Sequence, residues 1–85
     1  MTSAWSRTAH RVYERAPAKL ARSLNRCFAQ LERDPLQHPN IARLHGPLQG
    51  QFRFRVGHWR VVYEIDSEQA TINILLIAHR KNVYE

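Results

Sequence analysis

The chain has 85 residues, 44% of them hydrophobic and 9% aromatic, and its 13 lysines and arginines outnumber 7 acidic residues to give a formal net charge of +6. This length fits a single small domain, which we expect to span residues 1–85, and it excludes a large core. Cys27 is the only cysteine, which excludes an internal disulfide and a cysteine-based metal cluster. Without a signal peptide or an apolar run of membrane-spanning length, we expect a cytoplasmic protein with no cofactor.

The positive charge predicts a polyanionic partner, above all a nucleic acid. Most of the cations are arginines, whose planar guanidinium suits phosphate. The alternative is that the charge only keeps a small protein soluble. Where the cations lie along the chain has to decide between the two.

Two helices are predicted in the first half, because apolar residues recur there at helical spacing. Pro17 separates them and fits the first position of the second helix. Asp34, placed before Pro35, should end that helix. The apolar positions are Trp5, Ala9, Val12 and Ala16 in the first helix and Leu20, Leu24, Cys27, Phe28 and Leu31 in the second.

Residues 35–50 are rich in proline and glycine and are predicted to form a connecting loop. His38 and His45 lie in this loop without the spacing of metal ligands. We therefore expect both histidines to face solvent, and we expect no metal site.

From residue 51 the apolar period changes to two, which predicts β-strands. Residues 52–56 and 59–65 form two strands joined by a two-residue turn of Gly57 and His58. After a polar turn at 66–69, residues 71–78 are apolar on both faces, as in a central strand. The expected fold class is α+β, a two-helix hairpin packed on a small antiparallel sheet of three to four strands.

Arginines gather on one face of this predicted sheet. A tight turn places Arg55 directly opposite Arg60, with Arg53 on the same face, and we call these three residues the arginine face. The returning third strand brings His79 and Arg80 close to it. Like charges in opposite positions destabilise a strand pair, so a bound anion would explain the cluster. The alternative is a solvated face in which arginine stems cover apolar surface.

The second half also carries a specific pattern, which reads RLHGPLQG at 43–50, FRFRVGHWRVVYEID at 52–66 and IAHRKNVY at 77–84. These segments resemble the RelE/ParE toxin superfamily of type II toxin–antitoxin systems, and the helical hairpin before them has the order and length of such toxins. The resemblance implies the order β-α-α-β-β-β. Its first strand would lie at the sheet edge, and only residues 1–5 could supply it.

In RelE-type members basic residues and a tyrosine form the active face, and the matching positions here are Arg53, Arg55, Arg60, Arg80 and Tyr84. The resemblance therefore implies a ribosome-dependent mRNA endoribonuclease that inhibits translation. Its implied partners are the ribosomal A site, mRNA and a RelB-like antitoxin bound in a hetero-oligomer. We expect the free enzyme to be a feeble nuclease.

Attack by a ribose 2′-OH on RNA needs cations around the phosphate and a group that accepts a proton. The arginines can stabilise the phosphate, but arginine holds its proton too firmly to act as a base, whereas RelE has lysines on the strand. His58 and His79 titrate in the right range, and we favour His79. The alternatives are that His58 is a solvated turn residue and that His79 stacks on Trp59.

Two other functions stay open. ParE-like inhibitors of DNA gyrase share the fold but usually lack the full set of basic residues. An inactive module that only binds RNA or antitoxin is the third reading. Tyr84 could stack on a substrate base or orient the phosphate, although it is the penultimate residue.

Overall fold

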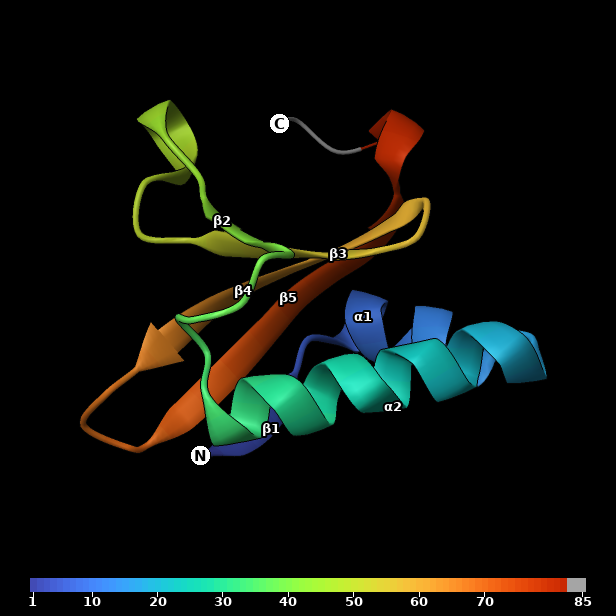
Figure 1. Ribbon diagram of the computed structural model, residues 1–85, viewed down its shortest axis with the longest axis horizontal. Helices are drawn as coiled ribbons and strands as arrows, with labels where there is room; N and C mark the ends of the chain where they lie inside the picture. Colours follow the sequence, from blue (N-terminus) through green and yellow to red (C-terminus); the bar gives the residue numbers. More distant parts are fainter. Residues whose placement is uncertain (83–85) are drawn as a thin grey trace.

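The structure, a computed structural model, describes residues 1–82, and its two helices cover one face of a twisted sheet (Figure 1). No helix within this range is both long and apolar enough to cross a membrane. The elements in chain order are β1 (Thr2–Trp5), α1 (Arg7–Glu14), α2 (Ala18–Arg33), β2 (Ile41–Arg43), the 3-10 turn η1 (Gly46–Leu48), β3 (Phe52–Val56), β4 (Trp59–Asp66), β5 (Thr71–His79) and the 3-10 turn η2 (Arg80–Asn82).

The sheet confirms the predicted α+β class but has more strands than expected. Its five strands follow the order β1-β5-β4-β3-β2, and β5 lies in the interior as the apolar pattern of 71–78 predicted. The sheet is mixed, because β1 pairs with β5 in parallel while the other neighbours are antiparallel. The sheet therefore has more strands than the expected three to four, and its β1–β5 pair is parallel although an antiparallel sheet was expected.

The missed strand is β2, which lies inside the predicted connecting loop. Ile41 pairs with Phe54 and Arg43 with Phe52, so β2 covers the outer edge of β3. A strand of three residues between proline and glycine has too few positions to show a period of two. The edge of β3 supplies the hydrogen bonds that hold it.

The N-terminal residues form the edge strand that the family resemblance implied. The predicted first helix began too early, because Trp5 ends β1 and α1 starts at Arg7. Ser6 marks the boundary, since its hydroxyl accepts a hydrogen bond from the backbone of Ala9 and so caps the helix. The Trp5 ring still reaches the core, where it lies edge-on to Phe28 with centroids 4.4 Å apart.

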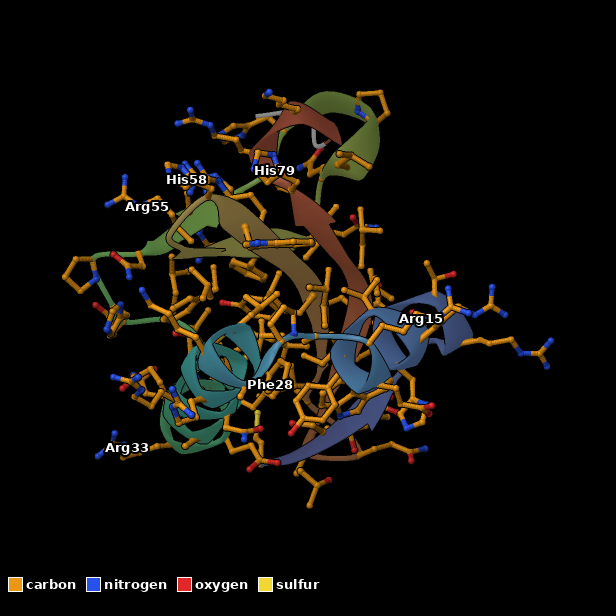
Figure 2. All side chains as sticks on the ribbon, turned by 90° about the vertical axis from the view of Figure 1, so that its right-hand side faces the viewer. Arg15, Phe28, Arg33, Arg55, His58 and His79 are labelled. Carbon is orange, nitrogen blue, oxygen red and sulfur yellow. The ribbon has the colours of Figure 1, made fainter. Side chains whose placement is uncertain are left out.

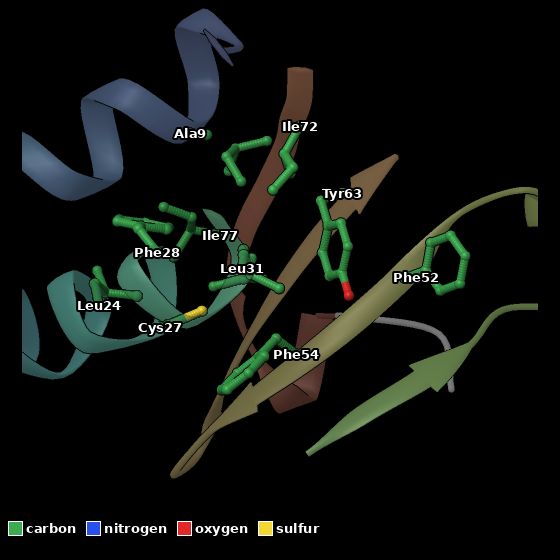
Figure 3. Close-up of a cluster of buried hydrophobic side chains, with 12 residues drawn as sticks. Ala9, Leu24, Cys27, Phe28, Leu31, Phe52, Phe54, Tyr63, Ile72 and Ile77 are labelled. Atoms are coloured by element: carbon green, nitrogen blue, oxygen red, sulfur yellow. The ribbon is translucent and has the colours of Figure 1, made fainter. Parts of the chain in front are cut away.

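Helix α2 packs its apolar stripe against the sheet as predicted. Pro17 is the N-cap and not the first helical residue, and Asp34 ends the helix. Leu24, Cys27 and Leu31 are almost fully buried, and burial raises the pKa of the Cys27 thiol to about 12. These side chains meet Phe54, Tyr63 and the isoleucines of β5 in one core (Figure 3).

Candidate functional site

The β3–β4 hairpin has the predicted register. Arg55 pairs with Arg60, Phe54 with Val61 and Arg53 with Val62. Phe54 and Val61 belong to the core under the helices, so alternation places the arginine face on the other side of the sheet. Gly57 opens the turn at a φ of +58°, a conformation that side chains disfavour.

Arg60 differs from the solvated side chain that alternation alone suggests, because it is only 7% exposed. Its Nη1 donates hydrogen bonds to the carbonyl oxygens of Gly57, at 3.1 Å, and Trp59, at 3.0 Å. The guanidinium is therefore held against the turn in one orientation. Sequence reasoning had no signal for this burial, which depends on where the turn carbonyls point.

Arg80 reaches the same end of the sheet through a tertiary contact. Its backbone N–H donates to the carbonyl of His58 over 2.7 Å, which ties η2 to the β3–β4 turn. The side chains of Arg55 and Arg80 are exposed, and no carboxylate of residues 1–82 forms an ion pair with either. Two exposed cations thus lie at the same end of the sheet as the fixed guanidinium of Arg60.

His79 lies at this end too, but alternation places its side chain on the opposite face of the sheet from Arg55 and Arg60. It pairs with Trp59, which pairs with Val56, and this row alternates with the row of Arg55 and Arg60. The His79 ring lies edge-on to Trp59 at 5.7 Å and stacks with His58 at 6.1 Å. Figure 2 shows Arg55, His58 and His79 together at the end of the sheet near the turn.

The surroundings of His79 favour a neutral ring. Desolvation by its neighbours and then the positive charges of Lys81, His58, Arg80 and Arg60 lower the pKa of His79. Its Nδ1 accepts a long hydrogen bond, 3.4 Å, from the backbone N–H of Lys81. In the neutral ring the hydrogen is therefore assigned to Nε2, which can donate to an oxygen nearby.

The family model described as "ParE toxin of type II toxin-antitoxin system, parDE" matches residues 4–84. The chain belongs to this toxin family. This confirms the resemblance to the RelE/ParE superfamily that residues 43–84 carried.

Individual relatives agree with this family. The toxin is 34% identical over 84 residues to Toxin RelG of Mycobacterium tuberculosis (strain ATCC 25618 / H37Rv), covering 98% of this chain and 94% of that protein. A chain in the crystal structure of the toxin–antitoxin complex RelBE2 from Mycobacterium tuberculosis is 31% identical, with a TM-score of 0.79 over 93% of this chain and 96% of the other. The YoeB/ParE toxin from Agrobacterium tumefaciens, 19% identical, shares the fold with a TM-score of 0.85 over 93% and 98% of the chains.

The remaining candidate residues of the toxin lie outside the group formed by Arg55, Arg60, His79 and Arg80. Tyr84 lies beyond the described residues, so its place at the site stays a prediction. His38 is half-buried, packs 4.9 Å from the Phe54 ring and accepts a hydrogen bond from the backbone of Asn40, so it is less exposed than expected. His45 is exposed. Within residues 1–82, no three side chains of histidine, cysteine, aspartate or glutamate gather in a way that could hold a metal ion.

Proposed function

We propose that the toxin is a ribosome-dependent mRNA endoribonuclease that inhibits translation, with the arginine face and Arg80 as its phosphate-binding site. The observation that carries this proposal is the direct pairing of Arg55 with Arg60 across the hairpin. Like charges directly opposite each other destabilise a strand pair, and an anion bound across the pair relieves that repulsion. A phosphodiester lying across β3 and β4 supplies that anion.

The chemistry follows from how these cations are held. Charge grows on the phosphate oxygens when a ribose 2′-OH attacks, and cations already in position stabilise that charge without reorganising. Arg60 is held by the turn carbonyls, while Arg55 and Arg80 are exposed and can close on the substrate. His79 is the proposed proton-transfer group, acting from the end of the sheet.

The cations free to reach a substrate, Arg55 and Arg80, are exposed at the surface, which supports a substrate positioned from outside. We assign this positioning to the ribosomal A site, which would present the mRNA across the arginine face. A RelB-like antitoxin is the second proposed partner, since relatives were crystallised as the RelBE2 complex and as an archaeal RelE–RelB complex from Pyrococcus horikoshii. It would neutralise the toxin by covering the cations.

The test is induction of the toxin without antitoxin, followed by primer extension on cellular mRNA. We expect growth arrest with new 5′ ends inside translated messages. Arg80→Ala should lower cleavage by about 10²-fold, the typical effect of removing one group that stabilises the transition-state charge. Arg15→Ala removes an exposed arginine from a distant part of the molecule and should leave cleavage unchanged (Figure 2). Intact mRNA in arrested cells would exclude the nuclease.

Inhibition of DNA gyrase is the second candidate, and the parDE description of the matching family favours it. It predicts that purified toxin blocks supercoiling by purified gyrase while mRNA stays uncut. An inactive RNA- or antitoxin-binding module predicts no growth arrest at any level of expression.

A further inference from the structure

Helix α2 carries four cations that the arginine face does not use. Lys19, Arg22, Arg26 and Arg33 are all exposed. At 3.6 residues per turn they fall within a sector of about 60° of the helix surface and extend over roughly 21 Å. We call these four residues the α2 stripe.

The stripe is not neutralised by its own helix. The only acid in α2, Glu32, points away from the sector and accepts a hydrogen bond from Ser3 of β1. Within residues 1–82 no carboxylate pairs with any of the four cations, and Arg33 donates only to the uncharged Gln30. Four like charges along one line repel one another, so the stripe is suited to an extended anion.

A groove connects the stripe to the hairpin. It has a volume of about 520 Å³ and runs between α2 and β3, with Arg26 and Arg33 on one side and Arg55 on the other. Figure 2 shows Arg33 and Arg55 on the same side of the molecule, while Arg15 projects from the opposite side. The arginine face lies on the other side of the sheet, so the α2 stripe and the proposed active site are two separate positive surfaces, and Arg55 is the residue of the arginine face that borders the groove.

We propose that the α2 stripe binds the phosphate backbone of a double-stranded RNA, separate from the strand that lies on the arginine face. The choice of RNA rests on the proposed function; the choice of a duplex rests on the residue types. Single-stranded RNA is bound by aromatic side chains that stack on its bases, and α2 exposes none in this sector. Duplex RNA is bound through backbone contacts and shape, for which a straight row of cations is sufficient.

An acidic protein fits the stripe less well. Protein interfaces have an apolar centre, whereas Met1 and Leu36 are the only large hydrophobic side chains within residues 1–82 that are strongly exposed, and neither lies on α2. A phosphate backbone needs cations alone.

The experiment measures binding of the full toxin to an RNA hairpin longer than the stripe and to a short single strand, over a series of salt concentrations. The test variant is Arg22→Gln with Arg26→Gln and Arg33→Gln. The matched control is Arg7→Gln with Arg11→Gln and Arg15→Gln, which removes the same charge from α1 and its C-cap. Thermal unfolding verifies that both variants are folded, and the corresponding lysine triple variant on α2 tests whether charge alone suffices.

We expect the α2 glutamine variant to bind the hairpin at least 10-fold more weakly at low salt. Each phosphate contact on a duplex contributes about 0.9 to the slope of log affinity against log salt, so the slope should fall by two to three. The α1 variant should lose clearly less hairpin affinity than the α2 glutamine variant. The α2 lysine variant should keep most of the slope of log affinity against log salt. The short single strand should bind the α2 variant as it binds the unchanged toxin.

Equal losses in the α1 and α2 variants would show that net charge alone binds the hairpin and would overturn the proposal. So would an unchanged hairpin affinity accompanied by lost binding of an acidic protein such as the antitoxin. These results are independent of cleavage: uncut mRNA in arrested cells would remove the proposed nuclease activity but leave the hairpin measurement interpretable.

Discussion

At the scale of single residues, the site combines cations held to different degrees. Arg60 is buried and hydrogen-bonded to the turn, whereas Arg55 and Arg80 are exposed. Substituting Arg60 therefore disturbs the turn as well as the proposed chemistry. Arg55 and Arg80 are the cleaner positions for testing phosphate binding.

The role of His79 can be separated into donating and accepting a proton. Glutamine places an amide N–H near the position of Nε2 but cannot take up a proton. If His79 only donates from Nε2, His79→Gln should keep most of the activity that His79→Ala loses. If His79 is the base, both variants should lose about 10² to 10⁴ in cleavage rate on programmed ribosomes. Equal, unchanged rates in both variants would remove His79 from the mechanism.

The pH profile gives a second measurement of the same group. A base must be neutral to act, and desolvation together with the charges of Lys81, His58, Arg80 and Arg60 lowers the pKa of His79 below its ordinary value of 6.5. The cleavage rate should therefore rise with pH along an acidic limb whose midpoint lies below 6.5, and stay high above it. This acidic limb of the pH profile should be absent in His79→Gln. If it is still present in that variant, it reports the titration of a group other than His79.

The register of the arginines was predictable from sequence, because a two-residue turn fixes which positions face each other. The burial of Arg60 was not, since it depends on two carbonyls of the turn that no sequence pattern specifies. The row of His79 could not be obtained by counting from the β4–β5 turn either, because the register shifts by one residue between Val62 and Tyr63 and moves His79 opposite Trp59.

At the scale of elements, Ser6 connects the helices to the sheet. Its hydroxyl accepts from the Ala9 backbone over 3.0 Å and donates to the carbonyl of Leu75 over 2.8 Å. Leu75 lies where the β4–β5 register shifts, so it has no partner in the β4 register. A serine at this place therefore serves both the start of α1 and the irregular point of the interior strand β5.

Replacing Ser6 by alanine should lower the free energy of unfolding by about 1 to 2 kcal/mol, because the cap and the bond to Leu75 are lost together. Urea unfolding followed by circular dichroism measures this change. Ser67→Ala, in the exposed turn before β5, should change stability by less than about 0.5 kcal/mol. Equal effects of both substitutions would contradict the proposed role of Ser6.

The long elements could be predicted and the short edge strands could not. The second helix and the strands at 52–56, 59–66 and 71–79 each show enough periods to be read. The strands β1 and β2 have only four and three residues, and they are held as strands by backbone pairing with β5 and β3. Parallel pairing of β1 with β5 joins residues nearly 70 positions apart, which local pattern cannot reveal.

At the scale of the whole molecule, stability depends on one small core. Ile74 of β5 is fully buried between the helices and β4, so Ile74→Ala should cost about 2 to 5 kcal/mol. A domain of this size has roughly 4 to 13 kcal/mol in total. Leu36→Ala, at an exposed position, is the control. Urea unfolding should show a large loss in the free energy of unfolding for Ile74→Ala and little change for Leu36→Ala. A loss of toxicity in Ile74→Ala would then reflect unfolding.

The position of β5 also bears on how the toxin is made. It lies between β1 and β4, yet a ribosome synthesises it after every other helix and strand that the structure describes. Until it emerges, β1 has nothing to pair with and the bond from Arg80 to His58 cannot form. A nascent chain therefore cannot complete its sheet, or tie the 3-10 turn η2 to the β3–β4 turn, until residues 71–80 have been synthesised.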